Sequence, residues 1–278
     1  MRVIHTNQDM KDVCRSVERP VGLVPTMGAL HEGHLALVRL AKQENRTLAA
    51  TIFVNPAQFG PGEDLQKYPR DLEKDLDLLR NEGADLVYVP DVEEVYPPGF
   101  DSWVEVGGLG DKLEGAHRPG HFRGVATVVA KLFNLIQPDR AYFGQKDGQQ
   151  TAIVRKMVKD LDFRVDVVVV PTVRNSDGLA LSSRNVYLTQ EQRRAAPVIY
   201  RALCASSRLW GDGGRNGDRL RAEVLATLRQ EPVLDGIDYV SVADAETLEE
   251  LEQVQGRAMV SVAVRLGNTR LIDNVILD

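Results

Sequence analysis

Short apolar runs rich in β-branched residues alternate with helical patterns in the N-terminal part of the chain. Residues 21–26 and 47–54 are such runs, and between them residues 34–41 place apolar side chains at a 3.6-residue period. This order predicts a βαβ unit with two parallel strands. The run 165–171 is nearly all valine, which is typical of a strand covered on both faces. We therefore expect an α/β fold built on a doubly wound parallel sheet.

The alternation continues to about Val173 and then stops. Before that point we expect helices at 69–82, 125–136 and 147–159 and strands at 85–89, 140–143 and 165–171. After a polar loop, we expect helices at 189–209 and 218–230 and strands at 237–243, 257–265 and 270–276, the last two joined by a Gly-Asn turn. This order predicts a doubly wound domain over 1–173 and a smaller α+β domain over 174–278.

Charge and cysteine content exclude several classes of protein. The chain has 34 lysines and arginines against 40 aspartates and glutamates, and this net charge of −6 disfavours binding to nucleic acid. Cys14 and Cys204 lie far apart and indicate neither a disulfide scaffold nor a metal-binding pair. The N-terminus is polar, and no apolar run is long enough to span a bilayer. We expect a cytoplasmic protein that binds neither nucleic acid nor membranes.

The turn after the first of these strands is the first candidate site. It reads PTMGALHEGHLALV, in which Gly28 and Gly33 allow the backbone to approach a ligand closely. The free N–H groups at the start of a helix favour phosphate. His31 and His34 can donate hydrogen bonds to phosphate oxygens as negative charge builds during nucleotidyl transfer. The pattern indicates a clamp for the α-phosphate of ATP.

Other sites must be weighed against this one. Four of the five histidines form the pairs His31-x-x-His34 and His117-x-x-x-His121, which leaves zinc open, although an HExxH motif is absent. Capping of a helix by the first pair, without any ligand, is a second alternative. A Walker A loop, the G-x-S-x-G elbow of hydrolases and the G-x-G-x-x-G turn of dehydrogenases are all absent.

Polar residues also follow the next strand. Asn55 opens the segment NPAQFG at the carboxyl end of that strand, where ligands bind in open parallel sheets. The amide of Gln58 suits a substrate with hydroxyl and carboxylate groups, and a loop-stabilising role is its alternative. Asp71, Asp75 and Asp77 lie on the following helix. One of them could hold magnesium, although most carboxylates on such a helix only contact water.

Two later segments carry further candidates. In FGQKDGQQ, Lys146 can bind a β- or γ-phosphate, Asp147 can cap the helix or bind ribose hydroxyls, and Gln150 faces the pocket one turn later. In LSSRN, Arg184 lies beside two serines, and such a loop can close over a triphosphate and neutralise the leaving pyrophosphate. A surface loop between the domains is the alternative for this segment.

Together these segments resemble the pantothenate synthetases (pantoate-beta-alanine ligases). The resemblance runs in order to about Arg194, through PTMGALHEGHLALV, FVNPAQFGPGEDLQKYPR, RPGHFRGVATVVAKLFNLIQPDRAYFGQKDGQQ and LALSSRNVYL. Other nucleotidylyltransferases and class I aminoacyl-tRNA synthetases share the H-x-G-H turn, whereas NPAQFG with FGQKDGQQ is far more specific. The resemblance implies a Rossmann-like nucleotidylyltransferase fold whose smaller C-terminal domain closes over the active site.

The resemblance also implies a two-step reaction. The carboxylate of (R)-pantoate attacks the α-phosphate of ATP, and beta-alanine's amine then attacks the pantoyl adenylate to give pantothenate and AMP. It implies His34 as the family's proton donor, with His31, Lys146 and Arg184 as further catalytic residues. We interpret both histidines as charge stabilisers, because pantoate is already a carboxylate and needs no base.

Binding residues follow from the same resemblance. Those implied for ATP are Met27, Gly28, Ala29, Leu30, His31, Glu32, Gly33, His34, Gly144, Gln145, Lys146, Asp147, Val173, Leu181, Ser182, Ser183 and Arg184. Gln58, Gln150 and Asn55 are implied for pantoate, Gln58 also for beta-alanine, and Asp75 for Mg2+. A homodimer and a place in coenzyme A precursor synthesis are implied as well.

Two points remain open. Gly148 stands where the family pattern leads us to expect a larger residue, and glycine there could loosen the start of the helix. A nucleotidylyltransferase with a different acceptor is the nearest alternative function, but an acceptor phosphate would call for extra cations, whereas the amides of Gln58 and Gln150 suit a hydroxy acid. A non-catalytic nucleotide-binding module is disfavoured by the full set of charge stabilisers.

Overall fold

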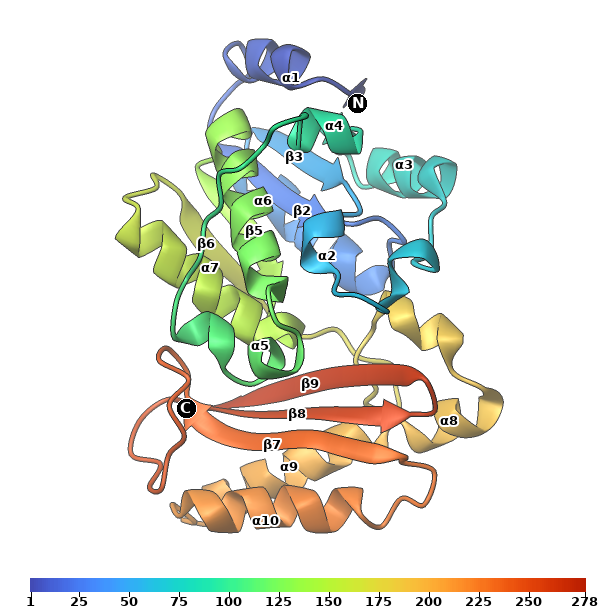
Figure 1. The fold of residues 1–278 in the computed structure, drawn as a ribbon, viewed down its shortest axis with the longest axis vertical. Helices are drawn as coiled ribbons and strands as arrows, with labels where there is room; N and C mark the ends of the chain where they lie inside the picture. Colours follow the sequence, from blue (N-terminus) through green and yellow to red (C-terminus); the bar gives the residue numbers. More distant parts are fainter.

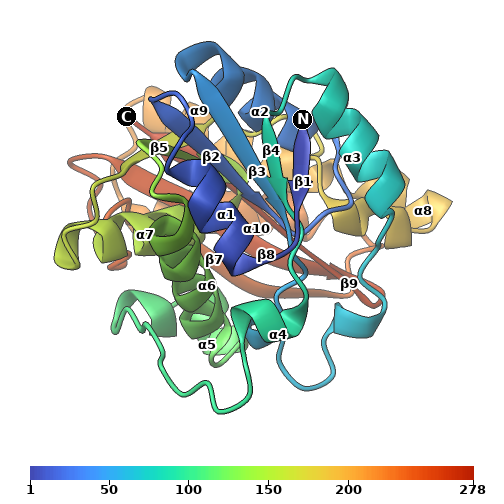
Figure 2. The same ribbon diagram turned by 90° about the horizontal axis from the view of Figure 1, so that it is seen from above.

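The computed structural model describes residues 1–278, and its first sheet consists of six parallel strands in the order β1-β4-β3-β2-β5-β6 (Figures 1 and 2). The strands are β1 Arg2–Ile4, β2 Val21–Thr26, β3 Thr47–Ile52, β4 Leu86–Tyr88, β5 Arg140–Gly144 and β6 Asp166–Val170. From β2 the order runs outward through β3 and β4 on one side and through β5 and β6 on the other, and β1 lies at the edge beside β4. The loops after β2 and β5 therefore flank the switch point, where ligands bind in open α/β sheets.

Helices cover both faces of this sheet. One face carries α1 Asn7–Cys14, α6 His121–Ile136 and α7 Gly148–Asp160, and the other carries α2 Glu32–Glu44 and α3 Leu72–Asn81 (Figure 2). Successive side chains of β2 point to opposite faces of the sheet. Leu23 packs in the core beneath α6, and Val24 packs in the core beneath α2. The doubly wound parallel sheet predicted from the sequence is confirmed.

The second sheet is antiparallel, in the order β7-β8-β9, with bounds Gly236–Asp244, Ala258–Leu266 and Thr269–Leu277. The helices α9 Val198–Gly211 and α10 Gly217–Leu228 cover its face away from the first sheet (Figure 1). A separate apolar core of residues from Leu179 to Leu277 lies between them. The predicted smaller α+β unit is thus confirmed, including the turn between β8 and β9.

Local signals were missed or misread in three places. The single helix predicted at 189–209 is wrong, because α8 Gln190–Ala195 and α9 are separate helices with Pro197 at the N-cap of α9, and proline lacks the N–H that a continuous helix needs. The strand β1 and helix α1 were not predicted, since a three-residue edge strand and an eight-residue helix show little periodicity. The short helices α4 Val92–Val95 and α5 Glu114–His117 were also missed.

No helix of the structure combines the length and the apolar character that crossing a membrane requires.

Candidate active site

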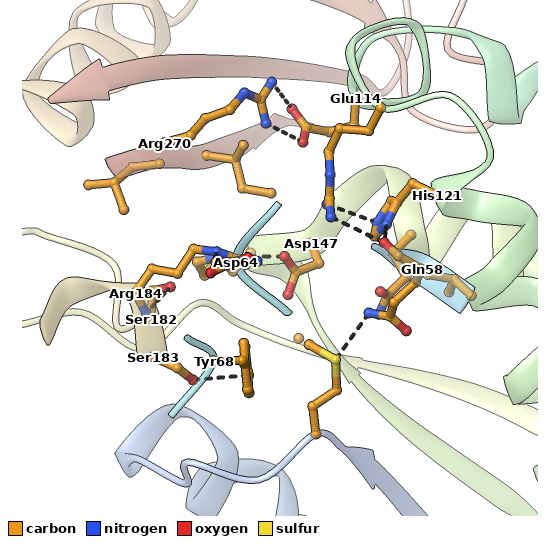
Figure 3. Close-up of a pocket in the computed structure, with 18 of the residues that line it drawn as sticks. Gln58, Asp64, Tyr68, Glu114, His121, Asp147, Ser182, Ser183, Arg184 and Arg270 are labelled. Carbon is orange, nitrogen blue, oxygen red and sulfur yellow. Dashed lines mark hydrogen bonds and ion pairs between the residues drawn. The ribbon is translucent and has the colours of Figure 1, made fainter. Parts of the chain in front are cut away.

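A cavity of about 1640 Å³ lies between the carboxyl edge of the parallel sheet and the antiparallel sheet (Figure 3). Both sheets contribute to its wall, with Thr26 from β2, Phe143 from β5 and Asp273 from β9. The cavity brings together most of the residues predicted for the site, namely Met27, His31, Gly33, His34, Asn55, Gln58, Gly144, Lys146, Asp147, Gln150, Val173, Leu181, Ser182, Ser183 and Arg184.

Two histidines cap the helix that begins at this cavity. His31 is the N-cap of α2, and its Nδ1 accepts a hydrogen bond from the backbone N–H of Gly33 at 3.1 Å. The Nδ1 of His34 accepts from the backbone N–H of His31 at 3.4 Å, and the two ring centroids lie 4.1 Å apart. A side chain on Gly33 would place its Cβ 2.9 Å from the His31 ring, so the motif needs glycine there. The pair therefore caps the helix through its Nδ1 atoms, and neither Nε2 atom takes part in the capping.

Both imidazoles are neutral at physiological pH. Burial lowers the pKa of His31 to about 4 and that of His34 to about 3, and the nearby ammonium of Lys146 acts in the same direction. Since Nδ1 of each ring accepts a hydrogen bond, the single proton of each neutral ring resides on Nε2. The site thus holds two N–H donors whose tautomer is set by the backbone of α2.

A tight turn after β5 carries Lys146, the cation that lowers the pKa of both histidines. Lys146 Nζ lies 3.4 Å from Asp147 Oδ1. Burial alone would raise the pKa of the Asp147 carboxyl, but the Lys146 ammonium lowers it below its ordinary value. Asp147 is at the N-cap of α7 without a capping hydrogen bond from its side chain, so its carboxylate is free to face the cavity.

The second sheet fixes this turn in place. Asn274 on β9 is buried, and its Nδ2 donates to the backbone oxygens of Gln145 and Lys146, both at 2.9 Å. Its Oδ1 accepts from the side chain of Gln145 at 2.8 Å. The position of Lys146 therefore depends on a residue more than a hundred positions later in the chain, for which the sequence offered no signal.

The amide of Gln58 also lines the cavity (Figure 3). Asn55 is buried, and its Nδ2 donates to Gln58 Oε1 at 3.0 Å and to the backbone oxygen of Gly124 at 3.1 Å. Gln58 Nε2 in turn lies 3.2 Å from the sulfur of Met27. Asn55 thus orients Gln58, and no stronger acceptor occupies the NH2 group of Gln58.

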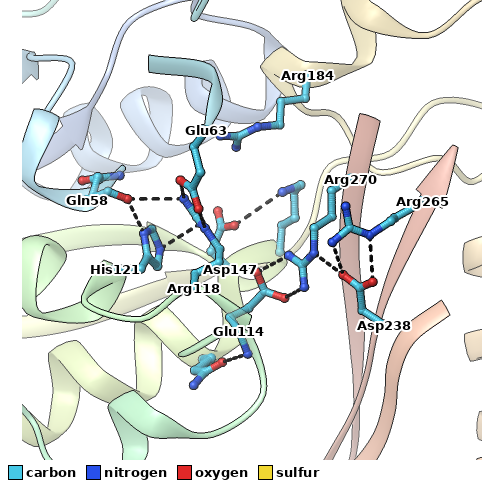
Figure 4. Close-up of polar contacts among 12 residues, drawn as sticks. Gln58, Glu63, Glu114, Arg118, His121, Asp147, Arg184, Asp238, Arg265 and Arg270 are labelled. Atoms are coloured by element: carbon cyan, nitrogen blue, oxygen red, sulfur yellow. Dashed lines mark hydrogen bonds and ion pairs between the residues drawn. The ribbon is translucent and has the colours of Figure 1, made fainter. Parts of the chain in front are cut away.

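Three residues that the sequence analysis did not assign to this site hold the Gln58 loop (Figure 4). Arg118 pairs with Glu63 through two hydrogen bonds, of 2.7 and 2.6 Å, and donates to the backbone oxygen of Gln58 at 3.3 Å. His121 Nδ1 lies 2.7 Å from the same oxygen. Burial lowers the pKa of His121 to about 4, so this ring is also neutral.

No group of three His, Cys, Asp or Glu side chains is arranged to hold a metal ion, and the zinc alternative has no support.

The loop after β6 contributes hydroxyls and a cation. Arg184 pairs with Asp64, with Nη2 to Oδ1 at 2.8 Å and Nε to Oδ2 at 3.0 Å, and its guanidinium lies 5.9 Å from the centre of the Tyr68 ring (Figure 3). Ser183 Oγ donates to the backbone oxygen of Ala29 at 3.3 Å. The loop is therefore linked to both the β2 turn and the segment after Gln58. Asp64 and Tyr68 were not predicted as site residues, although both lie in the segment FVNPAQFGPGEDLQKYPR that supports the family resemblance.

An ion-pair network contributes Glu114 and Arg270 to the wall of the cavity (Figure 4). Arg270 on β9 binds Glu114 on α5 through both Nη atoms, and its Nε donates to Asp238 at 2.6 Å. The Glu114 side chain is only 6% exposed, so this ion pair is shielded from water. The network joins the antiparallel sheet to helix α5 at a point that sequence spacing did not indicate.

The comparisons with known proteins agree with this arrangement. The family model for pantoate-beta-alanine ligase matches residues 2–276. The chain belongs to the pantoate-beta-alanine ligase family. A pantothenate synthetase from Roseiflexus sp. (strain RS-1) is 58% identical over 278 residues, which is the full length of both chains, and one from Herpetosiphon aurantiacus is 55% identical, also over both full lengths.

Solved structures of the family share the whole fold. A crystal structure of pantothenate synthetase from Thermus thermophilus is 52% identical, with a TM-score of 0.94 over 99% of each chain. A pantoate-beta-alanine ligase from Francisella tularensis, complexed with beta-gamma ATP and beta-alanine, is 33% identical, with a TM-score of 0.82 over 99% of this chain and 97% of that one. The family resemblance predicted from four segments therefore extends through the second sheet.

Some residues that the family resemblance implied do not line the cavity. These are Gly28, Ala29, Leu30, Glu32, Gln145 and Asp75. Glu32 instead pairs with Arg39 on the surface. Asp75 does not fit a magnesium ligand, because it is 1% exposed and each of its carboxylate oxygens accepts a backbone hydrogen bond from the β2 turn. We therefore assign no step of the reaction to a metal held by Asp75.

Gly148, the departure from the family pattern, has a packing reason. A Cβ there would lie 2.5 Å from the sulfur of Met259 on β8 and 3.1 Å from Nδ2 of Asn274. The absent side chain allows the second sheet to approach the start of α7. We expected glycine to loosen the start of this helix. The structure shows that glycine also permits the close contact with Met259 and Asn274.

Proposed function

We propose that this chain condenses (R)-pantoate with beta-alanine, using ATP, to form pantothenate, AMP and pyrophosphate through a pantoyl adenylate. The observation that carries the proposal is one cavity lined by two groups of residues, the neutral imidazoles with Lys146 and the oriented amide of Gln58. The first group suits a reacting phosphate, and the second suits a hydroxy acid.

In the first step a pantoate carboxylate oxygen bonds to the α-phosphorus, and the bond to pyrophosphate breaks. Negative charge grows on the phosphate oxygens, and the Nε2–H groups of His31 and His34 donate to them without changing protonation state. The helix that these residues cap adds the partial positive charge of its N-terminus. We propose this electrostatic role for both histidines in place of proton donation, because an imidazole with a pKa of about 3 or 4 carries no extra proton at neutral pH.

Lys146 and Arg184 neutralise the rest of the triphosphate in this proposal. Arg184 pairs with Asp64, and Lys146 lies beside Asp147, so each cation is already oriented by a carboxylate. The hydroxyls of Ser182 and Ser183 stand on the same loop and provide further donors. Charge-assisted hydrogen bonds of this kind position the leaving pyrophosphate.

Gln58 and Gln150 hold pantoate, and Gln58 also contacts beta-alanine. Asn55 acts on the substrates through Gln58, whose Oε1 it binds. In the second step the amine of beta-alanine attacks the acyl carbon, the bond to AMP breaks, and the amine releases a proton. The cation beside Gln58 is Arg118, which pairs with Glu63 through two hydrogen bonds and donates to the backbone oxygen of Gln58, so it holds the Gln58 loop.

The experiment that tests the proposal measures AMP and pyrophosphate with ATP and magnesium, first with pantoate alone and then with beta-alanine added. Sustained AMP release that requires both substrates is the expected result. Folded protein that binds ATP but produces no AMP, either with pantoate alone or with both substrates, would overturn the proposal. That result would favour a different acceptor or a non-catalytic module.

We also propose the assembly and the organisation that the family suggests. The division between the two domains falls at Val173 and Arg174, because β6 ends at Val170 and the second core begins at Leu179. The chain acts as a homodimer in the cytoplasm, and ATP enters as its magnesium complex. Light scattering coupled to size exclusion tests the dimer directly.

A further inference from the structure

Asp75 holds the turn that leads into the histidine pair. It lies in the first turn of α3, where its side chain is buried among residues of the β2 to α2 connection. Oδ2 accepts from the backbone N–H of Ala29 and Oδ1 accepts from that of Leu30, each at 2.8 Å. One carboxylate thus satisfies two consecutive backbone donors from a segment more than forty residues earlier.

The turn needs such a partner because of its backbone conformation. Gly28 and Ala29 have φ values of +82° and +51°, and the left-handed region is unfavourable for a residue with a side chain such as Ala29. The backbone N–H groups of Ala29 and Leu30 both donate to Asp75 and would lack this partner without its carboxylate. A Cβ on Gly28 would lie 2.8 Å from Asp75 Oδ2, so glycine is what lets the carboxylate come close.

The consequence reaches the site directly. Leu30 immediately precedes His31, the N-cap of α2. The anchored turn therefore sets the position of the two imidazole rings. The backbone oxygen of Ala29 in turn accepts a hydrogen bond from Ser183, in the loop after β6. The carboxylate oxygens of Asp75 face these backbone groups, and Asp75 is not part of the cavity wall.

We infer that Asp75 is a positioning residue, an anionic clamp on the Gly28 to Leu30 turn that places His31 and His34 against the reacting phosphate, and not a ligand of magnesium. This inference rests on the proposed function for what the histidines act upon. The clamp itself rests only on the geometry of the turn.

The test is Asp75→Asn, which keeps the shape but leaves one acceptor oxygen and turns an NH2 group toward a backbone N–H. We expect kcat for adenylation to fall by about 10- to 100-fold, as for other small displacements of reacting groups. The magnesium concentration that gives half-maximal rate should stay unchanged, and excess magnesium should not restore the rate. Backbone hydrogen exchange at Ala29 and Leu30 should become faster. The matched control is Asp77→Asn on the same helix, whose side chain is 69% exposed and which should behave as wild type.

A raised magnesium requirement in Asp75→Asn, or rescue by excess magnesium, would overturn the inference. If Asp75→Asn does not fold, the wild-type protein still decides the matter: amides of Ala29 and Leu30 that exchange as fast as those of an exposed loop would contradict the clamp. Wild-type protein that makes no AMP would sink the proposed function alone, since the exchange measurement needs no turnover.

Discussion

Replacing Gly148 with alanine tests how tightly the two sheets are joined at the site. The new Cβ would lie 2.5 Å from the buried sulfur of Met259 and 3.2 Å from Cγ of Asn274. Neither neighbour can yield freely, because Met259 is 2% exposed and Asn274 donates to the backbone oxygens of Gln145 and Lys146. The substitution therefore presses on the contact that fixes the Lys146 turn.

Two opposing terms set the magnitude. Alanine in place of glycine at a compatible helix position stabilises a protein by about 0.4–1 kcal/mol, through the lower entropy of the unfolded chain. Overpacking a well-filled core costs about 1–3 kcal/mol. We expect the second term to prevail, so that Gly148→Ala lowers the free energy of unfolding by roughly 1–2 kcal/mol and also slows adenylation.

The assay is a double-mutant cycle with Met259→Ala, read by urea unfolding. In the Met259→Ala background the sulfur is gone, and Gly148→Ala should then change stability by less than about 0.5 kcal/mol, which gives a coupling of at least about 0.5 kcal/mol. Equal effects of Gly148→Ala in both backgrounds would refute the reasoning, because the predicted clash would then not be the cause.

Three further predictions concern the site and its histidines. His34→Ala should slow adenylation by about 10²- to 10³-fold through the loss of one donor to the transition state, and an unchanged rate in folded variant protein would remove that role. Gln150→Ala should raise the KM for pantoate more than the KM for ATP, and equal increases would contradict its assignment. Stability should fall as the pH drops from 7 to 5, because the pKa values of His31 and His121 are about 4 and that of His34 is about 3. The unfolded chain, with an ordinary histidine pKa near 6.5, binds more protons below that pH, at up to about 1.4 kcal/mol per pH unit for each ring. Urea unfolding across this range measures the effect, and a flat profile would show that the rings are not buried in neutral form.

The helix α3 shows where prediction from sequence stopped. The residue pattern did not distinguish Asp71, Asp75 and Asp77, and only the family resemblance singled out Asp75, as a magnesium ligand. The structure gives each of the three a different environment. Asp71 caps the helix through the backbone N–H of Lys74, Asp77 pairs with Arg80 in solvent, and Asp75 is buried. Asp75 lies four residues before the buried Leu79, on the same inward side, and that spacing was the available signal.

The sequence by itself indicated the doubly wound parallel sheet, the smaller α+β unit and the turns that carry His31, His34, Gln58, Lys146 and Arg184. These are local properties, because hydrophobic period, glycine placement and helix starts are set by neighbours a few residues apart. Only the tertiary structure decided how those turns are held. Asn274 binds the Lys146 turn from the second sheet, Arg118 and Glu63 brace the Gln58 loop, and Asp75 anchors the turn before His31. Such contacts join residues tens to more than a hundred positions apart, and no local pattern records a partner that only the closed fold brings within hydrogen-bonding distance.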